Sequence, residues 1–182
     1  MNVFYLDSNP QQCAEFHCDK HTVKMIVEYA QLLSTAHRVC DGTQHDGIRV
    51  SGRKYKTWIL PDSRQHSLYQ STHINHPSAA WVRQSSGNYN WLYTMWLELM
   101  SEYTFRYNRQ HACEKLVEPL KKIPYNIQVG EFTQPPPAMP DYCKVPGDSI
   151  QSYRNYYIKE KSSFAKWKRE TPSWFRLFEV KQ

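Results

Sequence analysis

The sequence lacks the features that mark several large classes of protein. No run of about 18 apolar residues occurs, so no segment predicts a membrane-spanning helix. A basic and then apolar leader with a small-residue cleavage site is also missing, which argues against a secretion signal. The five cysteines are odd in number and lack CxxC spacing, so neither a disulfide framework nor a thiolate zinc site is expected. We therefore expect free thiols and a reducing, cytoplasmic location.

Aromatic residues, by contrast, are abundant: the 182 residues include six Trp, 13 Tyr and seven Phe. A chain of this length can bury a core without disulfides, and we expect one helical domain over residues 1–182. Some of the rings will fill that core, and others are available as stacking surfaces.

Apolar periodicity and capping residues predict mostly helical structure. Asn9-Pro10 is typical of a helix start and Asp41-Gly42 of a helix end, so one long helix is expected over about residues 10–39. A short strand or extended arm precedes it at residues 2–7. Further helices are expected at about residues 77–85, 89–107, 110–120 and 148–168.

Two segments do not follow the helical pattern. Residues 41–66 predict an irregular basic arm or a small hairpin around Ser51-Gly52, with cations at Arg49, Arg53, Lys54, Lys56 and Arg64. Residues 124–147 contain six prolines and predict a long connection that wraps the surface. The expected fold is therefore a mostly α, single-domain helical bundle with these two irregular segments.

The long first helix carries its polar residues in one narrow stripe. At roughly 100° per residue, six residues fall within about 80° of one another: His17, His21, Lys24, Glu28, Gln31 and Thr35. One interpretation is a thin solvent-facing strip of a core helix. The other is a site that faces a cavity, because the stripe mixes imidazole, ammonium and carboxylate groups. On the second interpretation the candidate catalytic residues are His17, His21, Lys24 and Glu28.

Most of the net charge of +6 lies in the C-terminal region (residues 149–182), which has eight basic and three acidic residues with interleaved aromatic residues. Cations bind phosphates and flat rings stack on bases, so this pattern favours nucleic-acid contact; an amphipathic helix with inward rings is the alternative. The candidate contacts here are Arg154, Lys161, Lys166, Lys168, Arg169 and Trp174. Four more lie in helices expected to border the polar stripe, although each is also compatible with an ordinary surface position: Arg83, Asn88, Arg106 and Arg109.

Four features together resemble the phage-type pyrimidine dimer DNA glycosylases. They are an N-terminal arm leading into a glutamate-bearing helix, an Asn75-His76-Pro77 helix start, a Glu102-Tyr103…Arg106 stretch, and a C-terminal Pro172-Ser173-Trp174-Phe175 segment. The chain also resembles a type of uncharacterised bacteriophage protein. The resemblance implies DNA as partner, no cofactor, and the host cytoplasm as location.

The resemblance also implies a mechanism. In that family the α-amine exposed by removal of the initiator methionine attacks the sugar C1′, a helix glutamate assists, and a Schiff base permits strand cleavage. Glu28 is the matching glutamate. Asn2 departs from the pattern, because a bulky second residue hinders methionine removal. The amine is then that of Met1, or the role passes to Lys20 or Lys24, or the activity is absent.

Three other interpretations remain open. His17 and His21 have the i, i+4 spacing of two metal ligands, and a third would come from His73, His76 or His111. Cys13 and His17 share the same spacing, which is compatible with a thiol nucleophile. The third is a non-catalytic accessory protein that binds nucleic acid through the basic C-terminal region.

Overall fold

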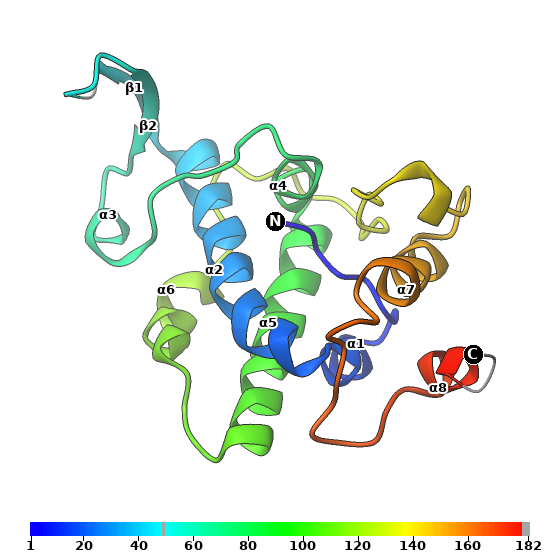
Figure 1. Cartoon of the computed structure of the whole chain (residues 1–182). Helices are drawn as coiled ribbons and strands as arrows, with labels where there is room; N and C mark the ends of the chain where they lie inside the picture. Colours follow the sequence, from blue (N-terminus) through cyan, green and yellow to red (C-terminus); the bar gives the residue numbers. More distant parts are fainter. Residues whose placement is uncertain (49, 180–182) are drawn as a thin grey trace.

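The computed structural model describes residues 1–48 and 50–179, so Arg49 and the last three residues lie outside it. The fold is mostly α, as predicted, with one two-stranded antiparallel sheet (Figure 1). The helices are α1 (Pro10–Phe16), α2 (Asp19–Asp41), α3 (Arg64–Ser67), α4 (Pro77–Val82), α5 (Ser86–Tyr107), α6 (Val117–Lys121), α7 (Ser149–Glu160) and α8 (Ser173–Glu179), with 3-10 turns η1 (Ala112–Leu116) and η2 (Asp141–Cys143). In the described ranges, no helix is both long and apolar enough to cross a membrane.

Helices α2 and α5 form the centre of the molecule, and α1 and α4 pack against them (Figure 1). Aromatic residues fill this core, as expected from the composition. Trp96 of α5 is fully buried, and its indole nitrogen donates to the Ile26 carbonyl of α2 over 2.9 Å. The hydrogen bond satisfies the one polar atom of a large apolar side chain and joins the two helices.

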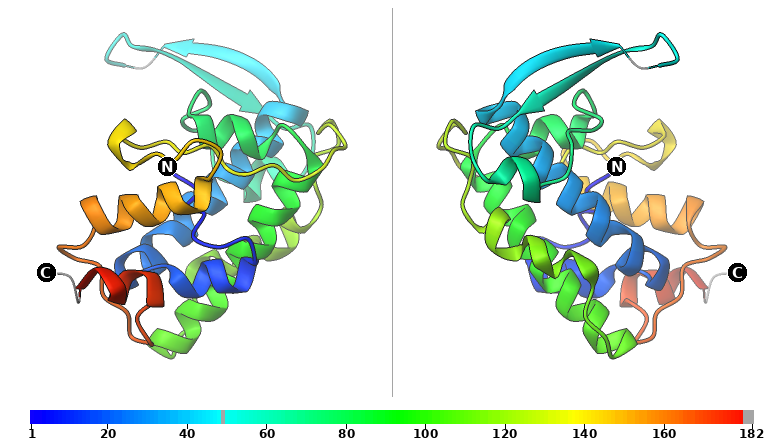
Figure 2. Two further views of the ribbon diagram at one scale, coloured as in Figure 1. Left: turned by 90° about the vertical axis from the view of Figure 1, so that its right-hand side faces the viewer. Right: turned by 90° about the vertical axis from the view of Figure 1, so that its left-hand side faces the viewer.

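The N-terminal arm (residues 2–7) is extended and buried between α2 and α7 (Figures 1 and 2). Val3, Phe4, Tyr5 and Leu6 are each at most 6% exposed. The backbone nitrogen of Phe4 donates to the hydroxyl of Tyr29 on α2, 3.1 Å away. Because four consecutive apolar residues are buried, the start of the chain is held in place within the core.

The predicted single helix over residues 10–39 is in fact two helices, which separate at His17 and Cys18. Both residues have extended backbone angles. Arg106 of α5 fills the break: its guanidinium donates to the carbonyls of Glu15 and His17 and pairs with Asp19 at 2.9 Å. Carbonyls freed at the end of α1 thus gain partners from another helix, which the periodicity of α1 and α2 does not reveal.

The basic segment at residues 41–66 contains the predicted hairpin. Strands β1 (Thr43–Ile48) and β2 (Lys54–Ile59) pair from Thr43↔Ile59 to Ile48↔Lys54. The hairpin extends beyond the helices from the end of α2, and Figure 2 shows it reaching across the top of the molecule.

The proline-rich connection wraps the surface, as predicted, and is fastened to the start of α5. Asn88 accepts from the Thr133 backbone nitrogen at 2.8 Å, and Ser85 donates to the Glu131 carbonyl at 2.8 Å. Gly87 is needed there, because a Cβ at this position would lie 2.5 Å from the Glu131 backbone. This close approach holds the connection against the start of α5, on one side of the core.

The C-terminal helix is shorter than predicted, since α7 ends at Glu160 rather than near residue 168. The chain then turns back over α1, where the Trp167 indole donates to the Phe16 carbonyl at 3.0 Å. The ring of Trp167 also packs on Phe175 of α8, with centroids 4.8 Å apart. For these rings to make their contacts, the chain must change direction after Glu160, which a helix continuing to residue 168 would prevent.

Candidate active site

The α-amine at the start of the chain lies beside the carboxylate of Glu28. The Met1 nitrogen is 3.6 Å from one Glu28 oxygen, and Lys24 Nζ is 3.0 Å from the other. The Glu28 side chain is 17% exposed and that of Lys24 is 69% exposed. A partly buried carboxylate therefore bridges two amines, one at the end of the buried arm and one at the surface of α2.

The arm positions this amine through contacts made by the two residues that follow it. Asn2 Nδ2 donates to the Ala138 carbonyl of the proline-rich connection at 2.8 Å. The Val3 backbone nitrogen lies 3.4 Å from the Ser78 hydroxyl on α4. The arm, the proline-rich connection and α4 together thus fix the position of the amine.

His76 belongs to the same neighbourhood. It caps α4, where its Nδ1 accepts from the Ser78 backbone nitrogen at 3.1 Å. Burial lowers the pKa of His76, the Met1 ammonium and His73 lower it further, and Glu28 opposes them. The influence of both Met1 and Glu28 on its pKa indicates that the imidazole lies near the amine–carboxylate pair. The lowered pKa keeps the ring neutral, and because Nδ1 accepts from Ser78, Nε2 carries the ring proton.

His21 lies one turn before Lys24 and connects α2 to α7. Its ring stacks on Phe4 at 4.3 Å, and its Nδ1 is 2.5 Å from the Tyr157 hydroxyl. Burial, with His17, Lys161 and Lys24 nearby, lowers the pKa of His21 to about 3. The neutral ring therefore accepts from the Tyr157 hydroxyl, which makes His21 a docking point for α7.

His17 lies in the core and not on a cavity, contrary to the expectation for the polar stripe. It is 0% exposed; its Nδ1 contacts the Cys13 carbonyl and its Nε2 the Tyr29 hydroxyl, both at 2.8 Å. Burial lowers the pKa of His17 to about 4. The network assigns the proton to Nδ1, so both ring nitrogens already have partners. Because the helix breaks at this residue, His17 is separated from the rest of the stripe.

Three of the predicted DNA contacts are occupied inside the protein. Arg106 is 7% exposed and serves the break between α1 and α2; Asn88 is 1% exposed and fastens the connection. Arg83 is half-buried and donates to the Ile74 carbonyl at 2.8 Å. The structure therefore corrects the surface placement expected for them, since Arg106 and Asn88 are bonded inside the protein and Arg83 has one nitrogen on Ile74 and another buried without a partner.

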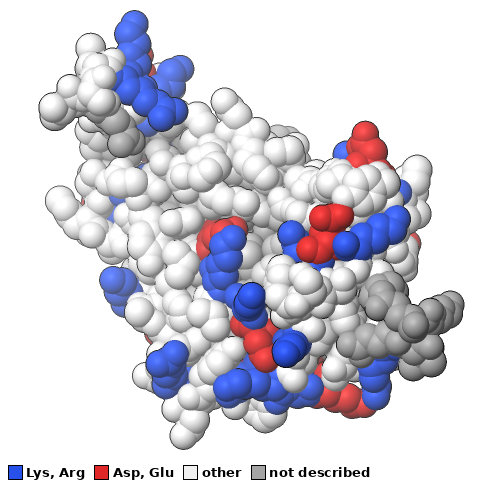
Figure 3. Space-filling model, viewed as in Figure 1, with Lys and Arg blue, Asp and Glu red and all other residues white. Residues whose placement is uncertain are grey.

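The C-terminal cations divide into two sets. Arg154 pairs with Asp7 at 3.3 Å, and Arg169 pairs with Glu102 at 2.9 Å and Glu15 at 3.1 Å. Trp174 packs edge-on against Tyr157 and Phe16 rather than facing outward as a stacking platform. The exposed or half-exposed candidates of this region are Lys161, Lys166 and Lys168, and Arg109, just after α5, is also exposed. Figure 3 shows Lys and Arg side chains gathered on the lower part of one face and at the hairpin.

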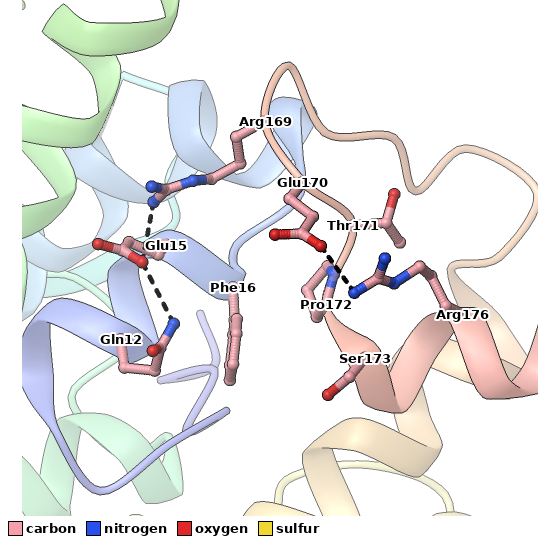
Figure 4. A pocket seen from close by; sticks show the side chains of 9 residues that line it. All are labelled: Gln12, Glu15, Phe16, Arg169, Glu170, Thr171, Pro172, Ser173 and Arg176. Atoms are coloured by element: carbon pink, nitrogen blue, oxygen red, sulfur yellow. Dashed lines mark hydrogen bonds and ion pairs between the residues drawn. The ribbon is translucent and has the colours of Figure 1, made fainter.

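A pocket of about 300 Å³ lies between α1 and the chain that leads into α8. Figure 4 shows Arg169 and Gln12 reaching the Glu15 carboxylate from two directions, while Arg176 turns towards Glu170. The pocket does not include Glu28. Since its charges are already matched in pairs, it fastens the C-terminal region to α1 rather than presenting a free charged group.

The metal and thiol interpretations gain no support from the geometry. Within residues 1–48 and 50–179, no three His, Cys, Asp or Glu side chains come together as metal ligands. All five cysteines are free. The Cys13 thiol faces the Phe4 carbonyl at 3.2 Å, while His17 contacts the Cys13 backbone and not its sulfur. Burial raises the pKa of the Cys13 thiol to about 12, which keeps it protonated.

The proximity of His76 to Glu28 did not follow from the sequence, although both residues stood out in it. The signal for His76 was the Asn75-His76-Pro77 motif, which positions a helix cap. Nor did the sequence indicate that the arm lies beside the polar stripe. Four consecutive apolar residues at positions 3–6 indicated burial, but not the element that covers them.

Comparison with known families agrees with the resemblance of the motifs. The family model for pyrimidine dimer DNA glycosylase matches residues 1–115, which is more than half of the chain. No curated protein and no solved structure matches. The matched region contains the arm, Glu28, His76 and Arg106, so it includes the whole amine–carboxylate site. The chain belongs to the pyrimidine dimer DNA glycosylase family.

Proposed function

We propose that this protein excises pyrimidine dimers from DNA and then cleaves the strand, with the Met1 α-amine as nucleophile and Glu28 as its catalytic partner. The carrying observation is the 3.6 Å separation between the Met1 nitrogen and the Glu28 carboxylate. Family membership supplies the glycosylase activity on DNA. The lyase step and the residue roles are our proposal.

The chemistry needs few groups. The neutral amine forms a bond to C1′ while the C1′–base bond breaks, and the base leaves with the electron pair and takes up a proton. The Glu28 carboxylate stabilises the positive charge that develops at the sugar and accepts a proton from the attacking nitrogen. The ring-opened iminium then loses a C2′ proton and the 3′ phosphate, and water releases the amine.

The α-amine is the better nucleophile of the two amines that contact Glu28. As a class, α-amines are weaker bases than lysine side chains, and an attacking amine must be neutral. Lys24 is also largely solvated, whereas the arm holds Met1 in one position. Lys24 instead contributes positive charge beside the site, where a DNA phosphate would lie.

The cations near the site favour DNA binding on the same face. Lys24 and Lys161 both act electrostatically on His21, so each lies near that residue. Lys166, Lys168 and Arg109 are exposed on the adjoining segments. We propose that these five residues contact phosphates, which would hold the strand while the damaged base is displaced.

Trapping with borohydride tests the proposal. The purified protein is incubated with a duplex that contains one cyclobutane dimer, reduced, digested and analysed by mass spectrometry. Intact mass identifies the first residue of the chain. The adduct is expected on the N-terminal peptide. Absence of an adduct on both dimer and abasic duplexes contradicts the enzymatic function, and salt-sensitive binding without adduct would indicate the accessory role.

A pair of glutamine variants tests the role of the carboxylate. Glu28→Gln is expected to reduce strand cleavage at least about 100-fold, because it removes the proton acceptor. Glu118→Gln is the matched control, since Glu118 is 79% exposed on α6. Retention of wild-type cleavage by Glu28→Gln on all substrates would exclude Glu28 as the catalytic partner. An adduct on the peptide that contains Lys24 would transfer the nucleophile to that residue.

A further inference from the structure

We propose that the β hairpin (residues 43–59) is a second DNA-contacting element, which enters a groove of the duplex several base pairs away from the reacting sugar. This inference rests on the proposed function, because it takes duplex DNA as the substrate. It concerns a part of the chain that plays no role in the amine–carboxylate chemistry.

The hairpin is fastened to the body only at its base. Trp58 is 8% exposed and Leu60, just beyond β2, is 3% exposed, whereas most of the residues towards the turn are exposed. At the far end, Ile48 is 70% exposed and Val50 is fully exposed. A two-stranded ribbon that presents large apolar side chains at its tip gains little stability from them in water. Their placement favours a function in binding.

Three exposed cations of the hairpin form no salt bridge within the part of the chain that the structure describes. Arg53, Lys54 and Lys56 are exposed, and none of them forms a salt bridge with any residue that the structure describes. The hairpin contains one acid, Asp46, which lies across from Lys56 in the register. Arg53 and Lys54 have no acid across from them in the register and are available to a polyanion, and release of counterions from DNA would drive the contact.

The shape of the hairpin fits a DNA groove. Its residues alternate between two faces, so Lys54 and Lys56 project from the same face as Ile48. On the other face the Tyr55 ring covers Gly47, where a Cβ would lie 2.6 Å from the ring. A two-stranded ribbon fits the major groove, which is about 12 Å wide, and apolar tips contact thymine methyl groups or wedge between bases.

The hairpin is also at a suitable distance from the site. It begins where α2 ends, and 13 residues of α2 separate Glu28 from Asp41. At about 1.5 Å per residue this is about 20 Å, or about six base pairs at 3.4 Å each. The base of the hairpin is therefore separated from Glu28 by a distance that one duplex spans.

Salt-dependent binding tests the inference. Full-length wild type is compared with an Arg53→Ala, Lys54→Ala, Lys56→Ala triple variant by fluorescence anisotropy, on a 30-base-pair duplex with one central tetrahydrofuran abasic analogue. The triple variant is expected to flatten the plot of log K against log salt by about 2 to 3, since each lost phosphate contact contributes about 0.9. The matched control is Lys115→Ala, Lys121→Ala, Lys122→Ala, which removes three exposed cations around α6.

Two further measurements sharpen the result. Hydroxyl-radical footprinting is expected to show protection about six base pairs from the analogue that the triple variant loses. Ile48→Ser with Val50→Ser should weaken binding severalfold without a change in the salt slope. A triple-variant slope equal to wild type, or equal to the α6 control, would overturn the proposal. If the serine variant loses self-association while its DNA affinity is unchanged, the tip instead contacts a second copy of the chain.

These outcomes separate the hairpin from the catalytic proposal. If wild type forms no borohydride adduct but the hairpin variant lowers the salt slope, the hairpin contact stands and the enzymatic function fails. If wild type forms the adduct and the slope is unchanged, the enzymatic function stands and the hairpin contact fails. Circular dichroism melts of each variant confirm that the protein compared is folded.

Discussion

The C-terminal region and the β hairpin are both basic and aromatic in sequence, but the structure uses their cations differently. In the C-terminal region Arg154, Arg169 and Arg176 each pair with a carboxylate of the chain. In the hairpin Arg53 and Lys54 are exposed and form no such pair with described residues. Positive charge in a sequence therefore does not measure the charge available to DNA, because neighbouring acids neutralise part of it in the fold.

The aromatic residues of the C-terminal region are likewise used inside the protein. Trp167 and Phe175 of the C-terminal region face each other inside the protein, and Tyr157 is 0% exposed. These rings therefore dock the region onto α1 and α2, which is the amphipathic alternative considered from the sequence. Lys166 and Lys168, on the outer side, remain as candidate phosphate contacts.

The largest effect is expected where the C-terminal region is anchored. Arg106→Ala should lower the free energy of unfolding by about 3–5 kcal/mol, because buried Glu102 loses one of its two cationic partners and the carbonyls at the helix break lose their donor. Urea denaturation measures the loss. A loss below about 1 kcal/mol would show that Arg106 does not organise the break, and the matched change Arg109→Ala, at an exposed position, should have little effect.

Low pH should weaken the packing of the C-terminal region and leave the hairpin unaffected. The folded pKa of His21 is lowered to about 3, so the unfolded chain takes up this proton first as the pH falls below about 6.5. The contribution of His21 to the free energy of unfolding is complete above that pH and is lost as the pH falls towards the folded pKa. Between pH 7 and pH 5 the loss is about 2 kcal/mol. Unfolding curves at the two pH values measure it, and His21→Gln should reduce the difference. An equal loss in wild type and variant would contradict this assignment.

Arg169→Ala separates a structural cation from a DNA-binding one. Because Arg169 pairs with Glu15 and Glu102 and is 25% exposed, its loss should cost about 1 kcal/mol of stability and leave the DNA salt slope unchanged. The hairpin triple variant should show the reverse pattern. A flatter slope for Arg169→Ala would mean that the guanidinium leaves its carboxylates to bind phosphate.

The smallest effect is expected for the exposed lysines of the C-terminal region. Lys166→Ala with Lys168→Ala should change stability by less than about 0.5 kcal/mol, since the variant removes surface charge. If both residues contact phosphates, the salt slope should fall by about 2. An unchanged slope would leave the site-proximal Lys24 and Lys161, with the hairpin, as the DNA-binding cations.

Much of the secondary structure was accessible from local patterns. Asn9-Pro10 marks the start of α1, and Ser51-Gly52 lies in the turn of the hairpin. The separation of α1 from α2 was not accessible, because Arg106 stabilises it from a position about 90 residues further along the chain. The early end of α7 likewise depends on where Trp167 finds its partners.

The candidate site was accessible in part. The polar stripe and the resemblance both led to Glu28, and the Asn75-His76-Pro77 motif included His76. The polar stripe also led to His17, which shares the helical spacing but lies in the core with both ring nitrogens occupied. Helical spacing shows which residues share a face, but not whether that face meets a cavity, the arm or the protein interior.

The sequence by itself determined a mostly helical chain, a basic hairpin, a proline-rich connection and the family to which it belongs, because these follow from local periodicity, turn chemistry and short motifs. Only the tertiary structure decided that the Met1 amine meets Glu28, that His17 and Arg106 are internal, and which cations remain unpaired. Those outcomes depend on contacts between residues far apart in the chain, where burial and neighbouring charges establish what each side chain is free to do.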